Sequence, residues 1–260
     1  REAATRRRWA AEQKALRDRR VSEPLDLAGA RGVAGADISF VKSSDEACAS
    51  LVVCALPDLQ VVYADFERVR MTEPYISGFL AFREVHFLTR LFERFERCRA
   101  AGQLGFDQLP LPEVRAMLLD GNGVLHPEGF GLACHLGVLL DLPTVGVAKT
   151  FLHVDGLTKD VVRERFAQHL TSCGHDGFAS VPLEGASGRV WGAAVRSVPG
   201  LTKPIYVSEG HRTDLDSCLA LVKLCSHYRV PEPIRQADLR SREWLREHRS
   251  PAEGQQQQDL

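Results

Sequence analysis

Three short runs of apolar and alternating residues, joined by still shorter polar connectors, lie near the start of the chain. The runs cover residues 33–41, 49–56 and 60–66, and the connectors contain SSDEA and Pro57-Asp58. Runs of this kind form β-strands, and strands joined by links of a few residues are antiparallel neighbours. The pattern therefore predicts a three-stranded meander.

After the meander, the pattern changes to alternating helices and strands. A Pro-containing loop at 71–78 precedes apolar residues at helical spacing from Phe82 to Phe95, which predict a long helix. A loop rich in Gly and Pro follows at 101–113. We expect further strands at 114–120, 144–148, 190–195 and 205–208, and further helices at 131–140, 158–170 and 213–228.

This order of elements predicts a single α/β domain over residues 1–249. Its mixed sheet would begin as the antiparallel meander, continue through parallel crossovers and carry helices on its faces. In that topology the first and fourth strands can lie side by side at the centre of the sheet.

The two ends of the chain are polar. Residues 1–20 carry eight basic and three acidic side chains and predict an amphipathic helix with a basic face. We interpret it as a solvated surface helix, with a supporting phosphate contact as the alternative. Residues 250–260, which include four glutamines at 255–258, predict a disordered polar tail.

Composition excludes some classes of protein. The 33 basic and 34 acidic residues nearly balance, whereas a histone-like nucleic-acid binder needs a strong basic excess; a focused basic patch is still compatible. No run reaches the roughly 18–20 apolar residues of a membrane span, so we expect no membrane partner. The seven cysteines form no CxxC pair and mostly lie in apolar runs, which indicates reduced, buried thiols in a cytoplasmic or nuclear protein. Because residue 1 is Arg rather than Met, the question of a removed signal segment is left open.

Three acidic residues stand where an acid is unexpected. Asp37 interrupts an apolar strand, Asp120 ends the strand at 114–120, and Glu84 opens the long helix. Each alone is most simply a turn former or a helix cap. If the first and fourth strands are neighbours, however, Asp37 and Asp120 meet at the sheet edge where ligands gather. Three oxygen ligands without cysteine favour Mg²⁺ or Mn²⁺.

Three basic residues follow similar turns. His126 comes after the Gly-rich turn GNGVLHPEG, Lys149 ends the strand TVGVAK, and His211 stands at a strand-to-helix turn. Alone, such residues are usually a structural histidine or a solvent-facing lysine. Together with the acids, they could balance charge on a phosphate in transfer. We assign Asp214 to helix capping and keep Asp216 as an acid supporting the metal site.

Five strings in fixed order carry a resemblance. GADISF, PYISGFLAFRE, LLDGNGVLHPEGFGLACHLG, TVGVAKT and SEGHR resemble the endonuclease V family over about residues 33–231. The resemblance implies an RNase H-like fold, with the metal-binding acids at Asp37, Glu84 and Asp120. It places further active-site residues at His126, Lys149 and His211. Members hydrolyse the second phosphodiester bond 3′ to inosine and leave 3′-hydroxyl and 5′-phosphate ends.

The same resemblance implies a pocket for hypoxanthine and a wedge residue. Tyr75 would stack where the flipped base left, whereas for Phe79 we prefer a hydrophobic staple onto the helix below. Ser77 stands where the family often has a second Pro, which loosens the wedge loop and suits a single-stranded substrate. The pocket residues implied are Gly78, Leu80, Gly121, Leu132 and Gly146, with Asn122 in the same Gly-rich turn.

These observations predict a Mg²⁺-dependent endoribonuclease, in which Mn²⁺ can substitute, acting on inosine-containing single-stranded RNA. Bacterial members act on deoxyinosine in DNA and animal members resemble ribonucleases, so a deoxyinosine-directed DNA-repair endonuclease is the alternative. A protein that binds inosine RNA without cutting it is a further alternative, and the presence of all three acids argues against it. The 101–113 loop looks longer than in bacterial members, and we assign it no role.

Overall fold

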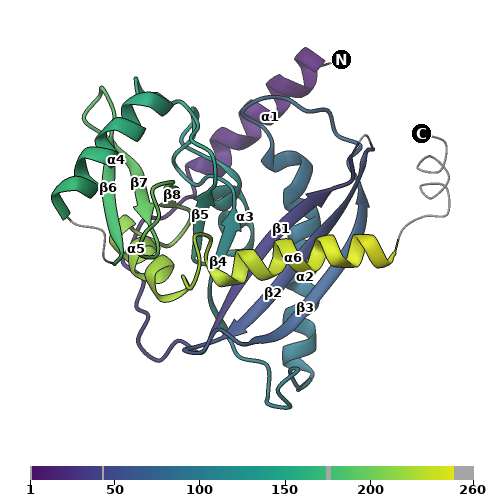
Figure 1. The fold of residues 1–260 in the computed structure, drawn as a ribbon. Coiled ribbons are helices and arrows are strands. Elements are labelled where there is room, and N and C mark those ends of the chain that lie inside the picture. Colours follow the sequence, from purple (N-terminus) through teal and green to yellow (C-terminus); the bar gives the residue numbers. More distant parts are fainter. Residues whose placement is uncertain (1, 43, 174–176, 249–260) are drawn as a thin grey trace, which may run out of the picture.

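An eight-stranded mixed sheet forms the centre of the structure, which is a computed structural model (Figure 1). The structure describes residues 2–42, 44–173 and 177–248, so the tail predicted at 250–260 lies outside the described residues. The strand order across the sheet is β3-β2-β1-β4-β5-β8-β7-β6. The strands are β1 (Gly32–Phe40), β2 (Glu46–Ala55), β3 (Val61–Arg70), β4 (Val114–Asp120), β5 (Thr144–Ala148), β6 (Ala179–Glu184), β7 (Val190–Arg196) and β8 (Ile205–Glu209).

The predicted meander and central pairing are confirmed. Strands β1, β2 and β3 are antiparallel neighbours, with Asp37 opposite Ser50. Strand β4 lies parallel to β1, and β5 lies parallel to β4. The carboxyl ends of β1, β4 and β5 therefore meet at one edge of the sheet, which is where their polar residues stand.

Beyond β5 the sheet continues differently from the prediction. Strand β8 pairs antiparallel with β5, and β7 and β6 extend the sheet in the same antiparallel manner. The prediction of parallel crossovers is therefore right only as far as β5. Strand β6 was missed because its sequence, ASVPLE, contains Pro182; proline is tolerated in an edge strand because no ladder hydrogen bond is lost there.

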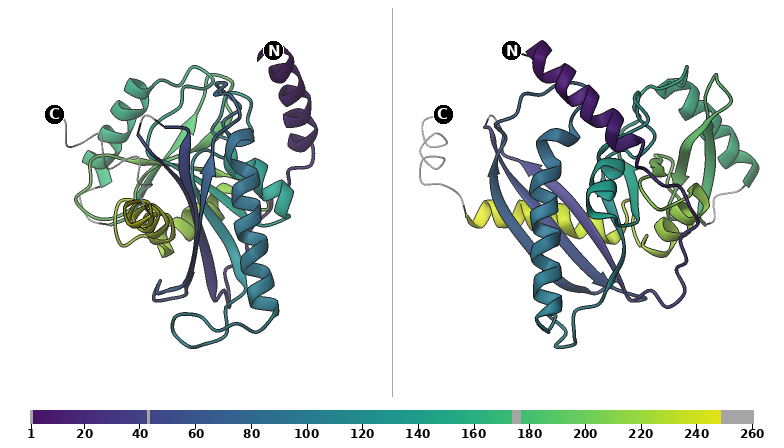
Figure 2. Two further views of the ribbon diagram at one scale, coloured as in Figure 1. Left: turned by 90° about the vertical axis from the view of Figure 1, so that its right-hand side faces the viewer. Right: turned by 180° about the vertical axis from the view of Figure 1, so that it is seen from behind.

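Helices cover both faces of the sheet. On one face, α2 and α3 pack against the even-numbered side chains of β1, such as Ala34 and Ala36. On the other face, α5 and α6 cover a second core that includes Val33, and Figure 2 shows α2 and α6 on opposite sides. Helix α4 packs on β6, β7 and β8. The helices are α1 (Glu2–Arg17), α2 (Ala81–Ala100), α3 (Leu132–Leu140), α4 (Lys159–Cys173), α5 (Leu215–Leu224) and α6 (Glu232–Glu247).

Helix α6 crosses the meander and was not predicted. Its sequence, EPIRQADLRSREWLRE, is rich in charge, and small residues supply much of its buried face. A Cβ added to Gly35 would lie 2.1 Å from the carbonyl carbon of Pro233. Glycine at this position therefore allows α6 to approach β1 closely, and this approach brings an α6 side chain to the edge of the sheet.

Helix α1 is confirmed as a helix but not as a fully solvated one. Trp9, Gln13 and Leu16 are buried, and the Trp9 ring stacks on Phe82 at 5.1 Å between centroids. The buried, unpaired cysteines are confirmed: of the six cysteine side chains described, all are free and only Cys98 is partly exposed. Among the described residues, no helix has both the length and the apolar character needed to cross a bilayer.

Candidate active site

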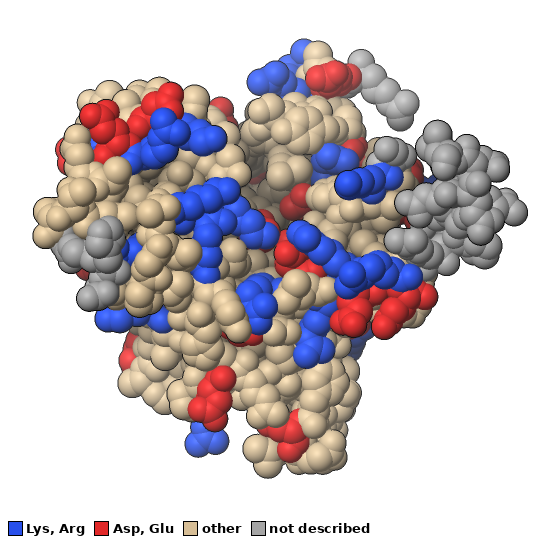
Figure 3. Space-filling model, viewed as in Figure 1, with Lys and Arg blue, Asp and Glu red and all other residues tan. Residues whose placement is uncertain are grey.

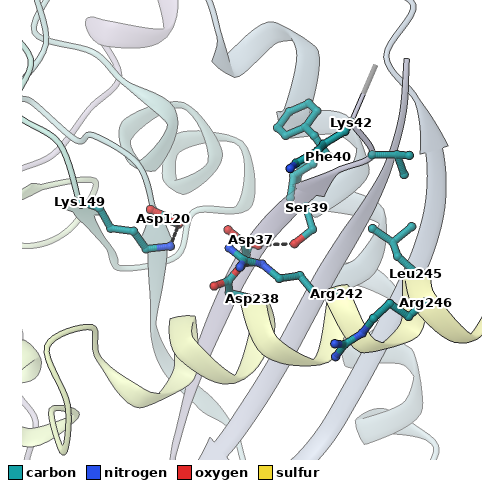
Figure 4. A pocket seen from close by; sticks show the side chains of 12 residues that line it. Asp37, Ser39, Phe40, Lys42, Asp120, Lys149, Asp238, Arg242, Leu245 and Arg246 are labelled. Carbon is teal, nitrogen blue, oxygen red and sulfur yellow. Dashed lines mark hydrogen bonds and ion pairs between the residues drawn. The ribbon is translucent and has the colours of Figure 1, made fainter. Parts of the chain in front are cut away.

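Side-chain alternation brings three predicted residues to one face of the sheet. Asp37 shares its face of β1 with Gly35, which abuts α6. Asp120 shares its face of β4 with Leu118, and Lys149 follows β5 in phase with Val147; both apolar residues belong to the core beneath α5 and α6. Because β1, β4 and β5 run in the same direction, Asp37, Asp120 and Lys149 converge at their carboxyl ends, and all three line one groove (Figure 4).

The acids and the lysine in this groove lie close together, and two of them form an ion pair. Lys149 Nζ lies 2.6 Å from Asp120 Oδ2, and Ser39 Oγ donates to Asp37 Oδ2 at 3.2 Å. Asp238 reaches the same groove from α6 and is held by Arg242, whose Nε lies 2.7 Å from its Oδ1. Sequence reasoning missed Asp238 because it missed α6. The groove has a volume of about 630 Å³.

The buried acids hold protons more tightly than free carboxyl groups do. Burial raises the pKa of Asp37 to about 7; the nearby charges of Asp120 and Asp238 add to this effect, and Lys149 opposes it. A hydrogen bond between the Asp37 and Asp120 carboxyl groups also raises the pKa of Asp37. Burial likewise raises the pKa of Glu84 to about 8, followed by repulsion from Asp37. A cation bound between these groups would favour their ionised forms.

The assignment of a metal ion to three acids stays a prediction. Glu84 lies in the first turn of α2 and is 6% exposed, and it is near enough to Asp37 and Asp120 for their charges to raise its pKa. Among the described residues, no three His, Cys, Asp or Glu side chains are grouped closely enough to hold a metal ion. The Asp37–Asp120 pair remains, and Mg²⁺ is commonly held by one or two carboxylates together with substrate phosphates. The pair therefore fits such an ion.

The two predicted histidines have other partners. His126 is buried and its Nδ1 accepts from the Glu128 N–H at 3.2 Å; burial lowers its pKa, and the neighbouring charge that acts on it is Glu128. The His211 ring accepts from the Val21 N–H and lies 3.1 Å from Asp141 Oδ1.

His211 therefore does not join the acids. It contacts Thr144, the first residue of β5, whereas Asp120 pairs with Val147 toward the other end of that strand. Its contacts tie the segment before β1 to the start of β5. Asp214 caps α5 by accepting from the Ser217 N–H at 2.8 Å, as predicted, but Asp216 is exposed on the first turn of α5 and does not line the groove.

Several residues predicted for base recognition gather beside the carboxyl end of β4. A Cβ added to Gly146 would lie 2.3 Å from the Gly123 nitrogen, and one added to Gly121 would lie 3.5 Å from the Leu132 side chain. The turn formed by Gly121, Asn122 and Gly123 thus lies directly on the Gly146 backbone. Asn122 Oδ1 is buried and has no hydrogen-bond partner among the described residues.

The wedge loop contains two aromatic residues in different environments. Tyr75 is 69% exposed, and the Arg83 guanidinium lies 5.8 Å from the centre of its ring. Phe79 is buried and packs on Phe82 of α2 at 6.0 Å and on Trp9 at 6.1 Å, so its packing onto the helix below is confirmed. Between them, Ser77 is exposed and the Gly78 carbonyl accepts from Gln13 Nε2 at 3.1 Å. Leu80 is also exposed, so Tyr75, Ser77 and Leu80 all face solvent.

Comparisons of the sequence place this geometry among known proteins. A family model described as Endonuclease V matches residues 14–239. Endonuclease V of Mus musculus is 47% identical over 247 residues, which is 92% of this chain and 69% of the mouse protein. Endonuclease V of Homo sapiens is 48% identical over 221 residues, which is 85% of this chain and 73% of the human protein.

Solved structures of endonuclease V also match this fold. The catalytic domain of human endonuclease V matches with a TM-score of 0.83 at 42% identity, covering 94% of this chain and 97% of the human one. Ciona intestinalis endonuclease V, in complex with a 24mer DNA containing an inosine followed by a ribo-adenosine, matches with a TM-score of 0.84 at 31% identity, covering 94% and 99%. With an RNase H-like sheet and these relatives, the chain belongs to the endonuclease V family of nucleases.

Proposed function

We propose that this protein is an inosine-directed endoribonuclease that hydrolyses the second phosphodiester bond 3′ to inosine in single-stranded RNA. The observation that carries the proposal is the convergence of Asp37, Asp120 and Lys149 at the carboxyl edge of three parallel strands. The Ciona relative supports the choice of base, because its bound DNA contains an inosine. The ribo-adenosine that follows this inosine supports a role for the 2′-hydroxyl at that position.

In this proposal, each groove residue has a separate role. Asp37 and Asp120 would hold Mg²⁺, or Mn²⁺ in its place, and such an ion would supply positive charge and Lewis-acid activation of water. Lys149, now paired with Asp120, would neutralise charge on the phosphate during transfer. Asp238 lies across the groove and can accept a proton at its carboxylate. Glu84 lies near the pair, and its raised pKa favours the protonated form until a cation binds.

Base recognition would be separate from cutting. Hypoxanthine offers an N1–H donor and an O6 acceptor and lacks the 2-amino group of guanine. A pocket lined by Gly121, Gly146 and Leu132 would bring backbone groups close to the base and exclude that amine. The unpaired Asn122 Oδ1 supplies an acceptor that an N1–H could satisfy.

A cleavage assay with four matched oligonucleotides tests the function. The strands are RNA with inosine, the same RNA with guanosine, DNA with deoxyinosine, and that DNA with one ribonucleotide after the deoxyinosine. With Mg²⁺ or Mn²⁺ we expect cutting of the first and the fourth, much less of the second, and none in EDTA. Equal cutting of the inosine and guanosine strands would contradict base recognition.

The same assay separates the alternatives. A deoxyinosine-directed DNA nuclease would cut the all-DNA strand as rapidly as the RNA, and the added ribonucleotide would change nothing. A protein that only binds inosine RNA would retain the first strand and release no fragment with either metal. Either outcome would replace the endoribonuclease proposal.

Tyr75→Ala should weaken binding of inosine RNA by about 1–3 kcal/mol, the usual value of one base stacked on an aromatic ring. Because Tyr75 is exposed and outside the apolar core, the stability of the protein should change little. Binding measured by fluorescence anisotropy in EDTA, with Tyr75→Phe as the matched control, checks this. Wild-type affinity in Tyr75→Ala would leave the ring without a role in binding RNA.

A further inference from the structure

A second pocket adjoins the groove of the acids and is strongly basic. Lys149 lines both. The second pocket, here called the basic pocket, has four cations among its nine lining residues and no acid: Lys149, Lys159, Arg163 and Lys203. They come from the end of β5, the start of α4 and the segment before β8. Figure 3 shows Lys and Arg side chains gathered on this side of the molecular surface.

The walls of the basic pocket are held together by a fifth cation. Arg229 Nη2 donates to the Pro204 carbonyl at 2.8 Å and to the Lys149 carbonyl at 3.3 Å, and its Nε donates to the Lys203 carbonyl at 3.1 Å. One guanidinium therefore fixes the chain after β5 against the chain before β8. It also adds positive charge beneath the pocket, so the geometry does not depend on surface side chains alone.

Negative charge offsets these cations only in part. Lys149 pairs with Asp120 at 2.6 Å. Asp160 lies 3.3 Å from Arg163, but both side chains are largely exposed, and an exposed pair of this kind gains little free energy. Lys159 and Lys203 form no ion pair in the part of the chain that the structure describes. The pocket therefore presents a net positive field next to the residue that faces the scissile phosphate.

We infer that the basic pocket binds a backbone phosphate of the nucleic-acid strand as the strand leaves the catalytic groove past Lys149. The ligand is a phosphodiester of single-stranded nucleic acid, because the cations are spread over three chain segments and the pocket shares Lys149 with the groove of the acids. This inference rests on the proposed function. It assigns Lys159, Arg163 and Lys203 to substrate binding and leaves the reacting atoms to the groove.

The salt dependence of binding tests the inference. Each phosphate contact to a single strand contributes about 0.7 to the slope of log affinity against log salt. In the full chain, the variant Lys159→Gln/Arg163→Gln/Lys203→Gln should bind inosine RNA in EDTA with a slope shallower by about 0.7, because the pocket neutralises one phosphate. Its affinity should be roughly fivefold lower near 0.1 M salt and should converge on the wild-type value near 1 M.

A matched control removes the same charge elsewhere. Arg31→Gln/Arg97→Gln/Lys223→Gln replaces three exposed cations that do not line either pocket, and it should retain the wild-type slope. Equal slopes for the two variants would overturn the basic pocket while leaving inosine-directed cutting intact. Failure of the proposed function would appear separately, as loss of preference for inosine over guanosine in the wild-type protein.

Discussion

Asp37→Asn should reduce cleavage of inosine RNA by at least roughly a thousandfold while changing RNA binding only severalfold. The substitution preserves the shape of the side chain and removes the charge that holds the metal ion. A metal ion contributes several kcal/mol to transition-state stabilisation, and each 1.36 kcal/mol is tenfold in rate. Affinity for RNA rests mainly on phosphate and base contacts, so it should persist. Single-turnover cleavage and anisotropy on the same preparation measure both quantities.

Asp120→Asn should have a similar effect, because Asp120 also orients Lys149 at 2.6 Å. Asp65→Asn is a suitable control: Asp65 lies on β3 in an ion pair with Arg94 and does not line the groove. Normal turnover in Asp37→Asn would remove Asp37 from the metal site and with it the proposed mechanism.

Asp37→Asn should also stabilise the metal-free protein, and increasingly so as pH rises from about 4 to about 7. The folded-state pKa of Asp37 is about 7 against an ordinary 3.8, so the native state binds this proton more tightly than the unfolded state does. The stability that the proton contributes is complete below pH 4 and is lost as pH rises through 7. This loss amounts to at most about 4 kcal/mol in the free energy of unfolding, and the Asp37→Asn variant does not suffer it.

The comparison of variant with wild type isolates this effect. Burial lowers the pKa of His86, His126 and His135, and these groups destabilise the fold as pH falls, which is the opposite sign. Denaturant unfolding in EDTA at several pH values, repeated with Mg²⁺, measures the difference. Added Mg²⁺ should stabilise the wild type and not the variant, because only the wild type retains the paired carboxylates. A difference in unfolding free energy that does not change with pH would mean that folding does not raise the pKa of Asp37.

The central half of the fold could be predicted because its signals are local. Strand alternation and short connectors identified β1, β2 and β3, and an acid at the end of β4 identified the edge. Helix α6 could not be identified in the same way. It packs through the small residues Ala237 and Ser241, and Gly35 on another strand makes room for it, so its buried face hardly appears in its own pattern of apolar residues.

Whether a site residue could be predicted depends on the same distinction between local signals and long-range contacts. Asp120 and Lys149 were predictable because each stands at a strand end whose direction the topology sets, and Asp37 was predictable because it interrupts an apolar strand. The partners of His211 are Val21 and Asp141, and the burial of Glu84 depends on how α2 packs on the sheet. These are long-range contacts, and short sequence motifs do not predict them.

The position of α6 has a consequence for how the enzyme is made. Asp37 and Asp238 are far apart along the chain, so the groove between them is complete only after α6 has been synthesised and has docked. A nascent chain that ends before residue 232 would lack this acid and the covering of one core. We therefore expect a ribosome-bound chain of that length to leave RNA uncut, so activity would begin only when α6 docks.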